Sequence, residues 1–334
     1  MNTKVIKLTD FVLAAARRYL KANCYTEVVV PRVVRASGAC ENINTLFEVS
    51  FNNDLKWFNG KRAYLAQTGQ LYLEALVPKL NNVYCVGPSF RAEPKADARH
   101  LTEFLMIEIE HPGGFDKLLK YIEGAVAAMA HSVAGYESTA EEFGLSADTL
   151  HRLSSCPDVF TKITYDEAIG TLQELGEAVG WGDDISSTQE KKLVEFYGNQ
   201  PLFITRFPDP MYDFGKDVAV EKFFNMLPDK ETPGRVLSAD LILPFGGEAV
   251  GSAARVHQAD VLVARLKNSR MFQRLVERGG GLEDFDWYIN QVKANGAVPH
   301  AGCGFGMARI IQWLLGAETI QQAVTFPANR ENLI

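Results

Sequence analysis

The amino-acid sequence predicts an α+β fold, in which helices flank a mostly antiparallel sheet. Alternating apolar residues indicate strands at 201–207, 236–244 and 298–306, and a strand–loop–strand pattern at 83–109 adds a hairpin. Helical periodicity instead dominates residues from about 116 to 199. A doubly wound nucleotide-binding fold is not supported, because the GCGFG run lies near the C-terminus with no βαβ unit after it.

The hairpin carries a polar loop with several charged side chains. Its sequence, GPSFRAEPKADARHLTEFLMIEIE, contains Arg91, Glu93, Arg99 and His100. The planar fork of arginine binds phosphate oxygens through two parallel charge-assisted hydrogen bonds, and two strands give it a rigid support. We therefore interpret the loop as a polyphosphate-binding element. The alternative is an exposed hairpin with a solvated tip.

A glycine run near the C-terminus gives a second signal. Gly302, Gly304 and Gly306 alternate, which suits a strand that lies against a ligand or another backbone. An apolar helical pattern follows, with Arg309 near its start. Cys303 lies within this run, and we interpret it as a small packing residue.

Together, the segments FRAE, RHLTEF and GFGMAR resemble motifs 2 and 3 of the class II aminoacyl-tRNA synthetases, in particular the aspartyl/asparaginyl subgroup. Residues 27–34 (EVVVPRVV), after an amphipathic stretch at about 9–22, resemble motif 1, a helix and a strand ending at Pro31. Residues 67–74 (QTGQLYLE) resemble the family's amino-acid-binding segment. Motif 1 forms the homodimer interface in that family, so the resemblance implies a homodimer.

The resemblance assigns several side chains to ATP. Attack at the α-phosphorus builds up negative charge that fixed cations must meet. By resemblance Arg91 contacts the α-phosphate and the amino-acid carboxylate, and Arg99 and His100 approach the β- and γ-phosphates. Phe104 stacks on one face of adenine, and Arg309 covers the other face or reaches the γ-phosphate. The alternative for each is a core aromatic residue or a surface cation.

Two further residues belong to the predicted nucleotide site. The resemblance assigns Glu93 to adenine or to the amino end of the substrate, and Gly306 to the nucleotide-binding glycine run.

Two acidic residues suggest a magnesium site. Asp240 and Glu248 lie in a segment that is otherwise apolar or glycine-rich, and buried carboxylates are costly unless paired or bound to metal. Mg²⁺ takes oxygen ligands from one or two carboxylates and from substrate phosphates, and the family places it here. Ser252 is near enough in sequence to assist.

The predicted amino-acid pocket contains Thr68, Gln70 and Arg255. The resemblance assigns Arg255 to the side chain of aspartate or asparagine, and the other two to the α-amino group. Aspartyl enzymes carry a lysine three residues after the glutamine, where this sequence has Leu73. The pattern therefore resembles the asparaginyl one, and both amino acids remain open as substrates.

Composition is typical of a cytoplasmic enzyme. The net charge of −7 gives no sign of a broad basic surface for RNA, and no apolar run approaches the roughly 18 residues that span a bilayer. No signal-peptide pattern is present, and the five cysteines show neither a disulfide framework nor zinc-ligand spacing.

The motif 1 helix begins within the first ten residues, so we expect a single catalytic domain over 1–334, with a helical insertion at about 116–199 and no N-terminal anticodon-binding barrel. tRNA is then not an expected partner. By resemblance the chain is similar to archaeal-type asparagine synthetases related to asparaginyl-tRNA synthetase.

The leading hypothesis is an AMP-forming ligase that uses ATP and Mg²⁺ to activate aspartate or asparagine as an adenylate, and then transfers it to ammonia or another small amine. The alternatives are a tailoring ligase in a biosynthetic pathway, a minimal asparaginyl-tRNA synthetase, and a non-catalytic amino-acid-sensing paralogue. A sensor has no need to keep Arg91, Glu248 and Arg309.

Overall fold

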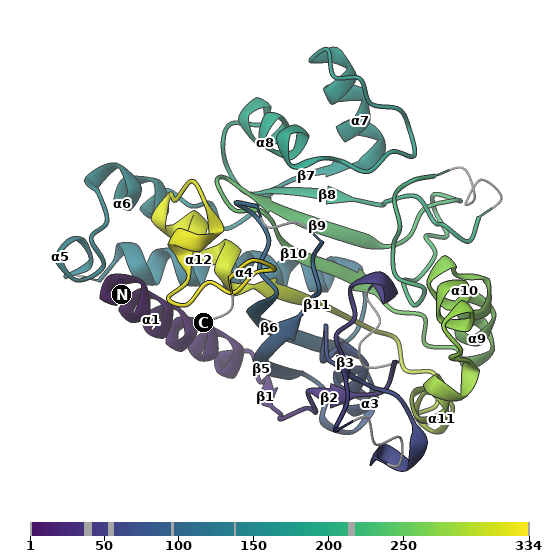
Figure 1. Cartoon of the computed structure of the whole chain (residues 1–334). Helices are drawn as coiled ribbons and strands as arrows, with labels where there is room; N and C mark the ends of the chain where they lie inside the picture. Colours follow the sequence, from purple (N-terminus) through teal and green to yellow (C-terminus); the bar gives the residue numbers. More distant parts are fainter. Residues whose placement is uncertain are drawn as a thin grey trace.

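The computed structural model describes residues 2–36, 42–52, 57–94, 97–136, 138–212 and 218–332. Its main sheet contains eight strands: β1 (Thr26–Glu27), β5 (Val83–Phe90), β6 (Glu103–Pro112), β7 (Thr161–Thr164), β8 (Leu202–Thr205), β9 (Ser238–Leu243), β10 (Gly247–Ala254) and β11 (His300–Gly306). Their order across the sheet is β1-β5-β6-β11-β10-β9-β8-β7 (Figure 1).

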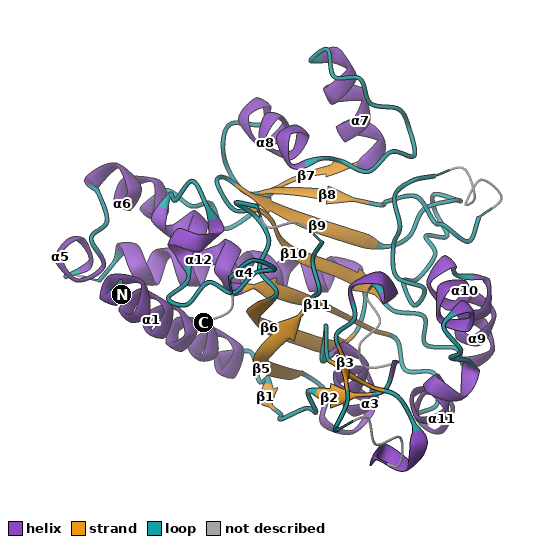
Figure 2. Ribbon diagram, in the orientation of Figure 1, coloured by secondary structure: helices purple, strands orange, loops and turns teal. Residues whose placement is uncertain are grey.

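The sheet is mostly antiparallel. All pairings from β5 through to β8 are antiparallel, and only the outermost strands, β1 and β7, run parallel to their neighbours. Figure 2 shows the sheet with helices on both sides. The predicted α+β fold is therefore confirmed.

The helices surround this sheet. They are α1 (Thr3–Ala22), α3 (Gln70–Leu80), α4 (Phe115–Ala134), α5 (Thr139–Phe143), α6 (Ala147–Ser154), α7 (Tyr165–Glu174), α8 (Ser187–Phe196), α9 (Ala259–Asn268), α10 (Arg270–Glu277), α11 (Asp286–Ala294) and α12 (Met307–Leu315). Helix α1 packs on α4, α4 packs against β10 and β11, and their apolar side chains form one core with α12. Within the described ranges, no helix is both long and apolar enough to cross a bilayer.

Short elements complete the fold. A second sheet contains β2 (Val33–Val34), β4 (Ala63–Leu65) and β3 (Glu48–Val49), in that order. The 3₁₀ turns are η1 (Ile43–Thr45), η2 (Trp57–Gly60), η3 (Leu282–Phe285) and η4 (Ile320–Ala323).

The segment predicted as motif 1 differs in detail from the expected helix and strand. Helix α1 begins at Thr3, earlier than the amphipathic stretch, while β1 ends at Glu27. The backbone N–H of Val28 still donates to Tyr84 O at 2.8 Å. Pro31 has no N–H to donate, so the chain leaves the main sheet around it. The side chain of Val29 is 100% exposed.

The predicted helical insertion at about 116–199 contains α4 to α8 and also strand β7. Strand β7 was not expected, because four residues, TKIT, are too short to show a period. It pairs with β8 from Thr161 opposite Leu202 to Thr164 opposite Thr205. Helix α8 contacts β9 and β10, so it lies beside the strands that carry the predicted metal ligands. The assignment of this segment as an insertion stays a prediction.

Candidate active site

Two adjoining cavities contain every residue that was predicted for the site. The first has a volume of about 150 Å³ and is lined by Thr68, Gln70, Arg91, Glu93, Arg99, His100, Phe104, Glu248, Gly306 and Arg309. The second has a volume of about 410 Å³, shares several of these residues, and adds Asp240 and Arg255. The structure therefore places the predicted site residues close to one another. The role of each residue stays a prediction.

A row of residues across the sheet forms the floor of the two cavities. Glu108 on β6 lies opposite Gly304 on β11, Gly304 opposite Gly251 on β10, and Gly251 opposite Asp240 on β9. The two central residues have no side chains, so space remains between two carboxylates. A Cβ at residue 304 would lie 2.5 Å from Met106 Cε.

Gly302 is needed for a different reason. It lies opposite Glu110, and a Cβ there would lie 2.1 Å from the carboxyl carbon of Glu110. The alternating glycines thus leave room for β6 side chains as well as for a ligand. Cys303 points into the apolar core on the other face, and burial raises the pKa of its thiol well above the ordinary range. This agrees with its interpretation as a packing residue.

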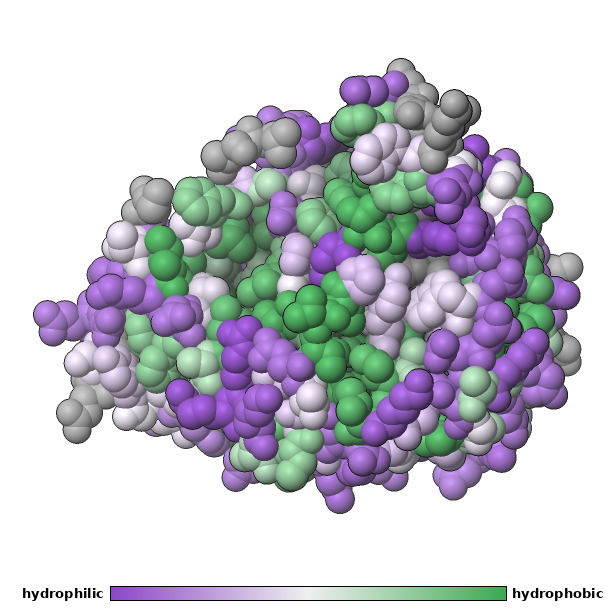
Figure 3. All heavy atoms as spheres, turned by 90° about the horizontal axis from the view of Figure 1, so that it is seen from below, coloured by the Kyte–Doolittle hydropathy of each residue, from purple (hydrophilic) through white to green (hydrophobic). Residues whose placement is uncertain are grey.

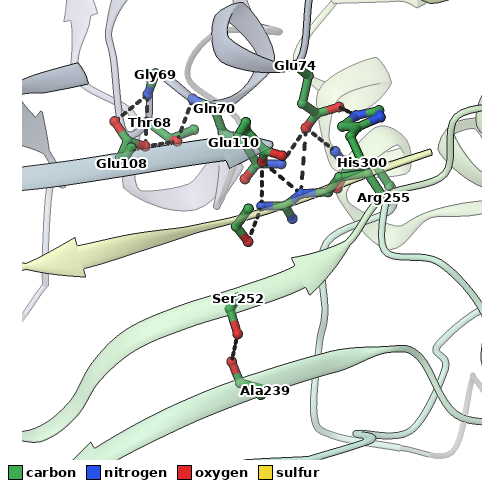
Figure 4. Close-up of polar contacts among 12 residues, drawn as sticks. Thr68, Gly69, Gln70, Glu74, Glu108, Glu110, Ala239, Ser252, Arg255 and His300 are labelled. Atoms are coloured by element: carbon green, nitrogen blue, oxygen red, sulfur yellow. Dashed lines mark hydrogen bonds and ion pairs between the residues drawn. The ribbon is translucent and has the colours of Figure 1, made fainter. Parts of the chain in front are cut away.

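Arg255 lies at the centre of a buried polar network (Figure 4). Its Nε donates to Glu110 Oε1 at 3.0 Å, and its Nη2 donates to the carbonyl of Gly302 at 3.0 Å. Glu74 Oε1 lies 3.9 Å from Arg255 Nε. Arg255 is 3% exposed, yet it lines the second cavity, so its charge is balanced by fixed acids before any substrate arrives.

Glu74 joins this network to helix α3 and to α11. Gln70 Nε2 and Asn225 Nδ2 each donate to Glu74 Oε1 at 2.7 Å. The hydroxyl of Tyr288 donates to Oε2, and His300 Nε2 lies 3.3 Å from the same oxygen. Every oxygen of this buried carboxylate is therefore engaged by at least two groups.

The network contains two oppositely charged pairs. Burial opposes ionisation of Glu74, but the hydrogen bond and charge of His300, together with Arg255, outweigh it and lower the pKa of Glu74. Burial likewise opposes the charged form of His300, and Glu74 outweighs it and raises the pKa of His300. Desolvation raises the pKa of Glu110 to about 7, against the pull of Arg255. With all four groups ionised, the network is electrically neutral.

The turn between β4 and α3 is fixed by Glu108. The N–H of Gly69 donates to both carboxylate oxygens of Glu108, at 3.0 and 2.8 Å, and Thr68 Oγ1 donates to Oε1 (Figure 4). Arg32 Nη1 lies 3.8 Å from Oε2. The hydroxyl of Thr68 and the side-chain amide of Gln70 thus already donate to acidic residues of the protein, Glu108 and Glu74 respectively.

Sequence reasoning missed the acids and partners of this network: Glu74, Glu108, Glu110, Asn225, Tyr288 and His300. A signal was present in the run MIEIE, where Glu108 and Glu110 alternate with isoleucines on one face of a strand. Both carboxylates and both isoleucines are buried, so neither face of β6 contacts solvent there.

A β-bulge places Glu248 over the cavity floor. Glu248 pairs with Ile242 and Val250 with Leu241, so Ala249 is an extra residue in β10. The bulge puts Glu248 on the same face as Gly251, whose Cβ position would lie 3.4 Å from Glu248 Oε1. Arg309 Nη1 donates to the carbonyl of Glu248 at 2.6 Å, which ties helix α12 to the bulge.

The predicted magnesium ligands lie on neighbouring strands. Asp240 Oδ2 accepts a hydrogen bond from Lys222 Nζ at 2.5 Å, while Glu248 is exposed to the cavity. Burial raises the pKa of Asp240 to about 7, against the pull of Lys222. Ser252 was predicted to assist, but its hydroxyl donates to the carbonyl of Ala239 at 2.7 Å and thus serves the sheet (Figure 4).

Two carboxylates suit Mg²⁺ when substrate phosphates complete its shell. Among the described residues, no group of three or more acidic, histidine or cysteine side chains could hold a metal by itself. The donor set therefore fits a metal that arrives with a nucleotide. Glu248 and Asp240 would hold it, and Asp240 would have to exchange its hydrogen bond from Lys222 for the metal.

In the predicted phosphate-binding loop, the described residues Asp97, Arg99 and His100 contact one another. Asp97 Oδ1 accepts from the backbone N–H groups of Arg99 and His100, at 2.8 and 3.1 Å, and from the imidazole of His100. The guanidinium of Arg91 lies 5.5 Å from the ring centroid of Phe104. Cations and an aromatic ring thus surround the first cavity, as expected for a nucleotide site.

Comparison with known proteins agrees with this geometry. Residues 1–330 match the family of tRNA synthetases class II (D, K and N). The Asparagine--tRNA ligase of Pelotomaculum thermopropionicum is 35% identical over 291 residues, which cover 86% of this chain and 61% of that protein. That of Pyrococcus horikoshii is 34% identical over 326 residues, with coverages of 97% and 68%.

Solved structures give the same result. The asparaginyl-tRNA synthetase from Pyrococcus horikoshii, complexed with asparaginyl-adenylate, superposes with a TM-score of 0.83 at 32% identity, covering 99% of this chain and 70% of that one. The Entamoeba histolytica enzyme with asparaginyl-adenylate gives 0.81 at 28% identity. The chain spans 61% to 70% of the length of these curated relatives and of the Pyrococcus structure. With a matching family model over residues 1–330 and matching relatives, the chain belongs to the class II tRNA synthetases of the D, K and N group.

Proposed function

We propose that this enzyme activates asparagine on its α-carboxyl group and forms asparaginyl-adenylate. The observation that carries the proposal is the network around Arg255, in which two acids contact two bases, so that their charges cancel when all four groups are ionised. Taking an unpaired charge out of water is costly, so a buried pocket favours the substrate that leaves its charges balanced. The amide of asparagine adds no charge to Arg255, Glu110, Glu74 and His300, whereas an aspartate side chain adds one negative charge.

Leu73 supports the same choice. Where aspartyl enzymes place a lysine, this residue is fully buried in an apolar cluster with Val30, Val77, Val83 and Cys85. No cation from this position can balance an aspartate side chain. The relatives are named Asparagine--tRNA ligase, which points to the same amino acid. The aspartate and ammonia reaction expected from the sequence is thus the less supported alternative.

The chemical step follows from the cations around the first cavity. A carboxylate oxygen of asparagine attacks the α-phosphorus of ATP, a P–O bond forms, and the bond to the β-phosphate oxygen breaks to release pyrophosphate. Arg91, Arg99, His100 and Arg309 all line this cavity. In the proposal, Arg91 meets the charge at the α-phosphate, and the other three meet the charge on the leaving group. Glu108, which lines the same cavity, offers the acceptor that an α-amino group needs. Bound Mg²⁺ would neutralise phosphate charge at Glu248 and Asp240.

The acceptor in our proposal is a small amine. The net charge of −7 opposes binding of a polyanion such as tRNA, and the 410 Å³ cavity next to Arg255 has room for a small nucleophile. The relatives are named as tRNA ligases, so charging of tRNA is the competing outcome. A cytoplasmic location belongs to the same proposal, because the reaction consumes intracellular ATP.

We also propose a homodimer formed through the predicted motif 1. Val29 is fully exposed, and Ile6, Val33 and Leu80 are 40%, 47% and 42% exposed. Figure 3 shows the face at the bottom of Figure 1, where hydrophobic side chains gather near the centre and hydrophilic ones surround them. A second copy would bury such a patch.

Amino-acid preference tests the main proposal. We expect ATP–pyrophosphate exchange to favour asparagine over aspartate by at least roughly tenfold in kcat/KM, which corresponds to about 1.4 kcal/mol. Glu74→Gln removes one negative charge and should narrow this preference, with thermal melting as the control for folding. Equal exchange with aspartate, and free asparagine formed from aspartate and ammonium, would contradict the proposal. Efficient charging of purified tRNA would contradict the small-amine acceptor.

Removal of the phosphate cations tests the chemical step. Arg91→Ala and Arg309→Ala should each lower exchange by on the order of 10²-fold or more, because a fixed cation at developing charge is lost. Arg18→Ala removes an exposed arginine of α1 and should change little. If either site variant keeps half of the wild-type rate, its assigned role is wrong.

The metal assignment predicts a changed magnesium requirement. Glu248→Gln keeps the shape of the side chain and removes its charge, so the magnesium concentration for half-maximal exchange should rise sharply. Glu277→Gln, at an exposed position of α10, is the matched control. An unchanged magnesium titration in the Glu248 variant would place the metal elsewhere.

The dimer proposal predicts the effect of a buried charge. Val29→Glu should shift the protein from dimer to monomer in sedimentation equilibrium, because an unpaired carboxylate would be desolvated in the interface. Val159→Glu provides the control, since Val159 is 69% exposed and lies before β7. A monomeric wild-type protein would refute the proposal directly.

A further inference from the structure

Helix α8 carries a buried carboxylate next to the phosphate loop. The helix begins after Ser186, whose side chain accepts from the N–H of Gln189 in a capping box. Glu190, in the first turn, points toward the sheet and is 8% exposed. No catalytic or binding role was predicted for this helix from the sequence.

Glu190 contacts a residue that was assigned to the phosphates. Arg99 Nη2 donates to Glu190 Oε2 at 2.9 Å. Both residues line a cavity of about 480 Å³ that also contains His100, Glu248 and Arg309. Burial and the charge of Glu248 raise the pKa of Glu190, against the pull of the two arginines, Arg99 and Arg309. A carboxylate between two arginines thus lies where the terminal phosphates of ATP are expected.

The contact fixes both ends of Arg99. Its backbone N–H donates to Asp97 Oδ1 at 2.8 Å, and its guanidinium is held by Glu190. The ion pair uses a terminal nitrogen of Arg99, and a guanidinium has five N–H donors in all, so others can reach a phosphate. Because the Arg99 side chain is already ordered before ATP binds, the entropy of ordering it does not weaken ATP binding.

A glycine makes this contact possible. Gly247, at the start of β10, has a φ of +64°, and a Cβ there would lie 2.5 Å from Arg99 Nη2 and 2.9 Å from Glu190 Oε2. The ion pair therefore passes directly over a residue without a side chain. A merely solvent-exposed ion pair would not require such a close approach.

We propose that Glu190 is a positioning residue that holds Arg99 ready for the β- and γ-phosphates of ATP, so that helix α8 forms part of the nucleotide site. The inference rests on the proposed function only in taking ATP as the nucleotide. It does not depend on which amino acid is activated.

The test compares ATP with AMP, which lacks the two terminal phosphates. Binding of each nucleotide with Mg²⁺, and without amino acid, is measured by titration calorimetry. Glu190→Ala should weaken ATP binding roughly tenfold and leave AMP binding unchanged, because only the terminal phosphates use Arg99. Glu190→Gln keeps an oxygen that can accept from Arg99, so it should bind ATP nearly as the wild type does. If the alanine variant fails to fold, Glu190→Gln is compared with the wild type in its place.

A steric variant tests the same contact without changing the acid. Gly247→Ala should separate Arg99 from Glu190 and weaken ATP binding in the same selective way. Gly176→Ala is its control, because Gly176 has a φ of +81° and nothing within 4 Å of its Cβ position. It should bear a similar backbone strain while ATP and AMP binding stay at the wild-type values.

Several results would overturn the inference. One is equal weakening of ATP and AMP in Glu190→Ala; unchanged or tighter ATP binding would do the same. If the wild type binds no ATP, this inference and the proposed function both fail. If the selective loss of ATP binding holds but asparagine supports no exchange, only the proposed function fails.

Discussion

The register of four neighbouring strands is the constraint on which the site depends. It places Glu108, Gly304, Gly251 and Asp240 in one row, with an acidic residue at each end and two glycines in the middle. Because side chains alternate along a strand, a shift by one residue would replace the glycine floor with Cys303 or Phe305. The cavity is therefore a property of strand pairing, and the residues at its rim can act only because the pairing is held.

Next to this row, the chain buries groups of opposite charge, and one of them, Arg255, also lines the second cavity. Glu74, Glu110 and His300 lie on α3, β6 and β11, and Arg255 directly follows β10. Desolvating these four charged groups is costly unless each is matched by an opposite charge. Their mutual contacts fix α3 and β11 relative to β6. The same buried charges disfavour a substrate that adds a further charge. In our proposal, the contacts that hold these elements together therefore also select asparagine over aspartate.

The fold, and the residues that line the candidate phosphate site, could be predicted from the sequence, because both depend on local signals. Arginines in a polar loop, alternating glycines and a downstream helix are each visible within about twenty residues. The acids of the buried network were missed, because Glu74 looks like an ordinary helical residue and Glu110 like a strand residue with a polar face. Their meaning depends on Arg255, which is 145 residues from Glu110. The contact of Arg99 with Glu190 spans 91 residues and has no local signature at all.

The bulge at Ala249 limits how the family can vary this part of the chain. One additional residue determines that Glu248 faces the cavity rather than the core. Replacing an amino acid in β10 alters one contact, but deleting a single residue would turn Glu248 to the opposite face while Arg255 stayed anchored beyond it. For the stretch from Gly247 to Arg255, we therefore expect the number of residues to matter more than most side chains, so that an insertion or deletion there is more damaging than most substitutions.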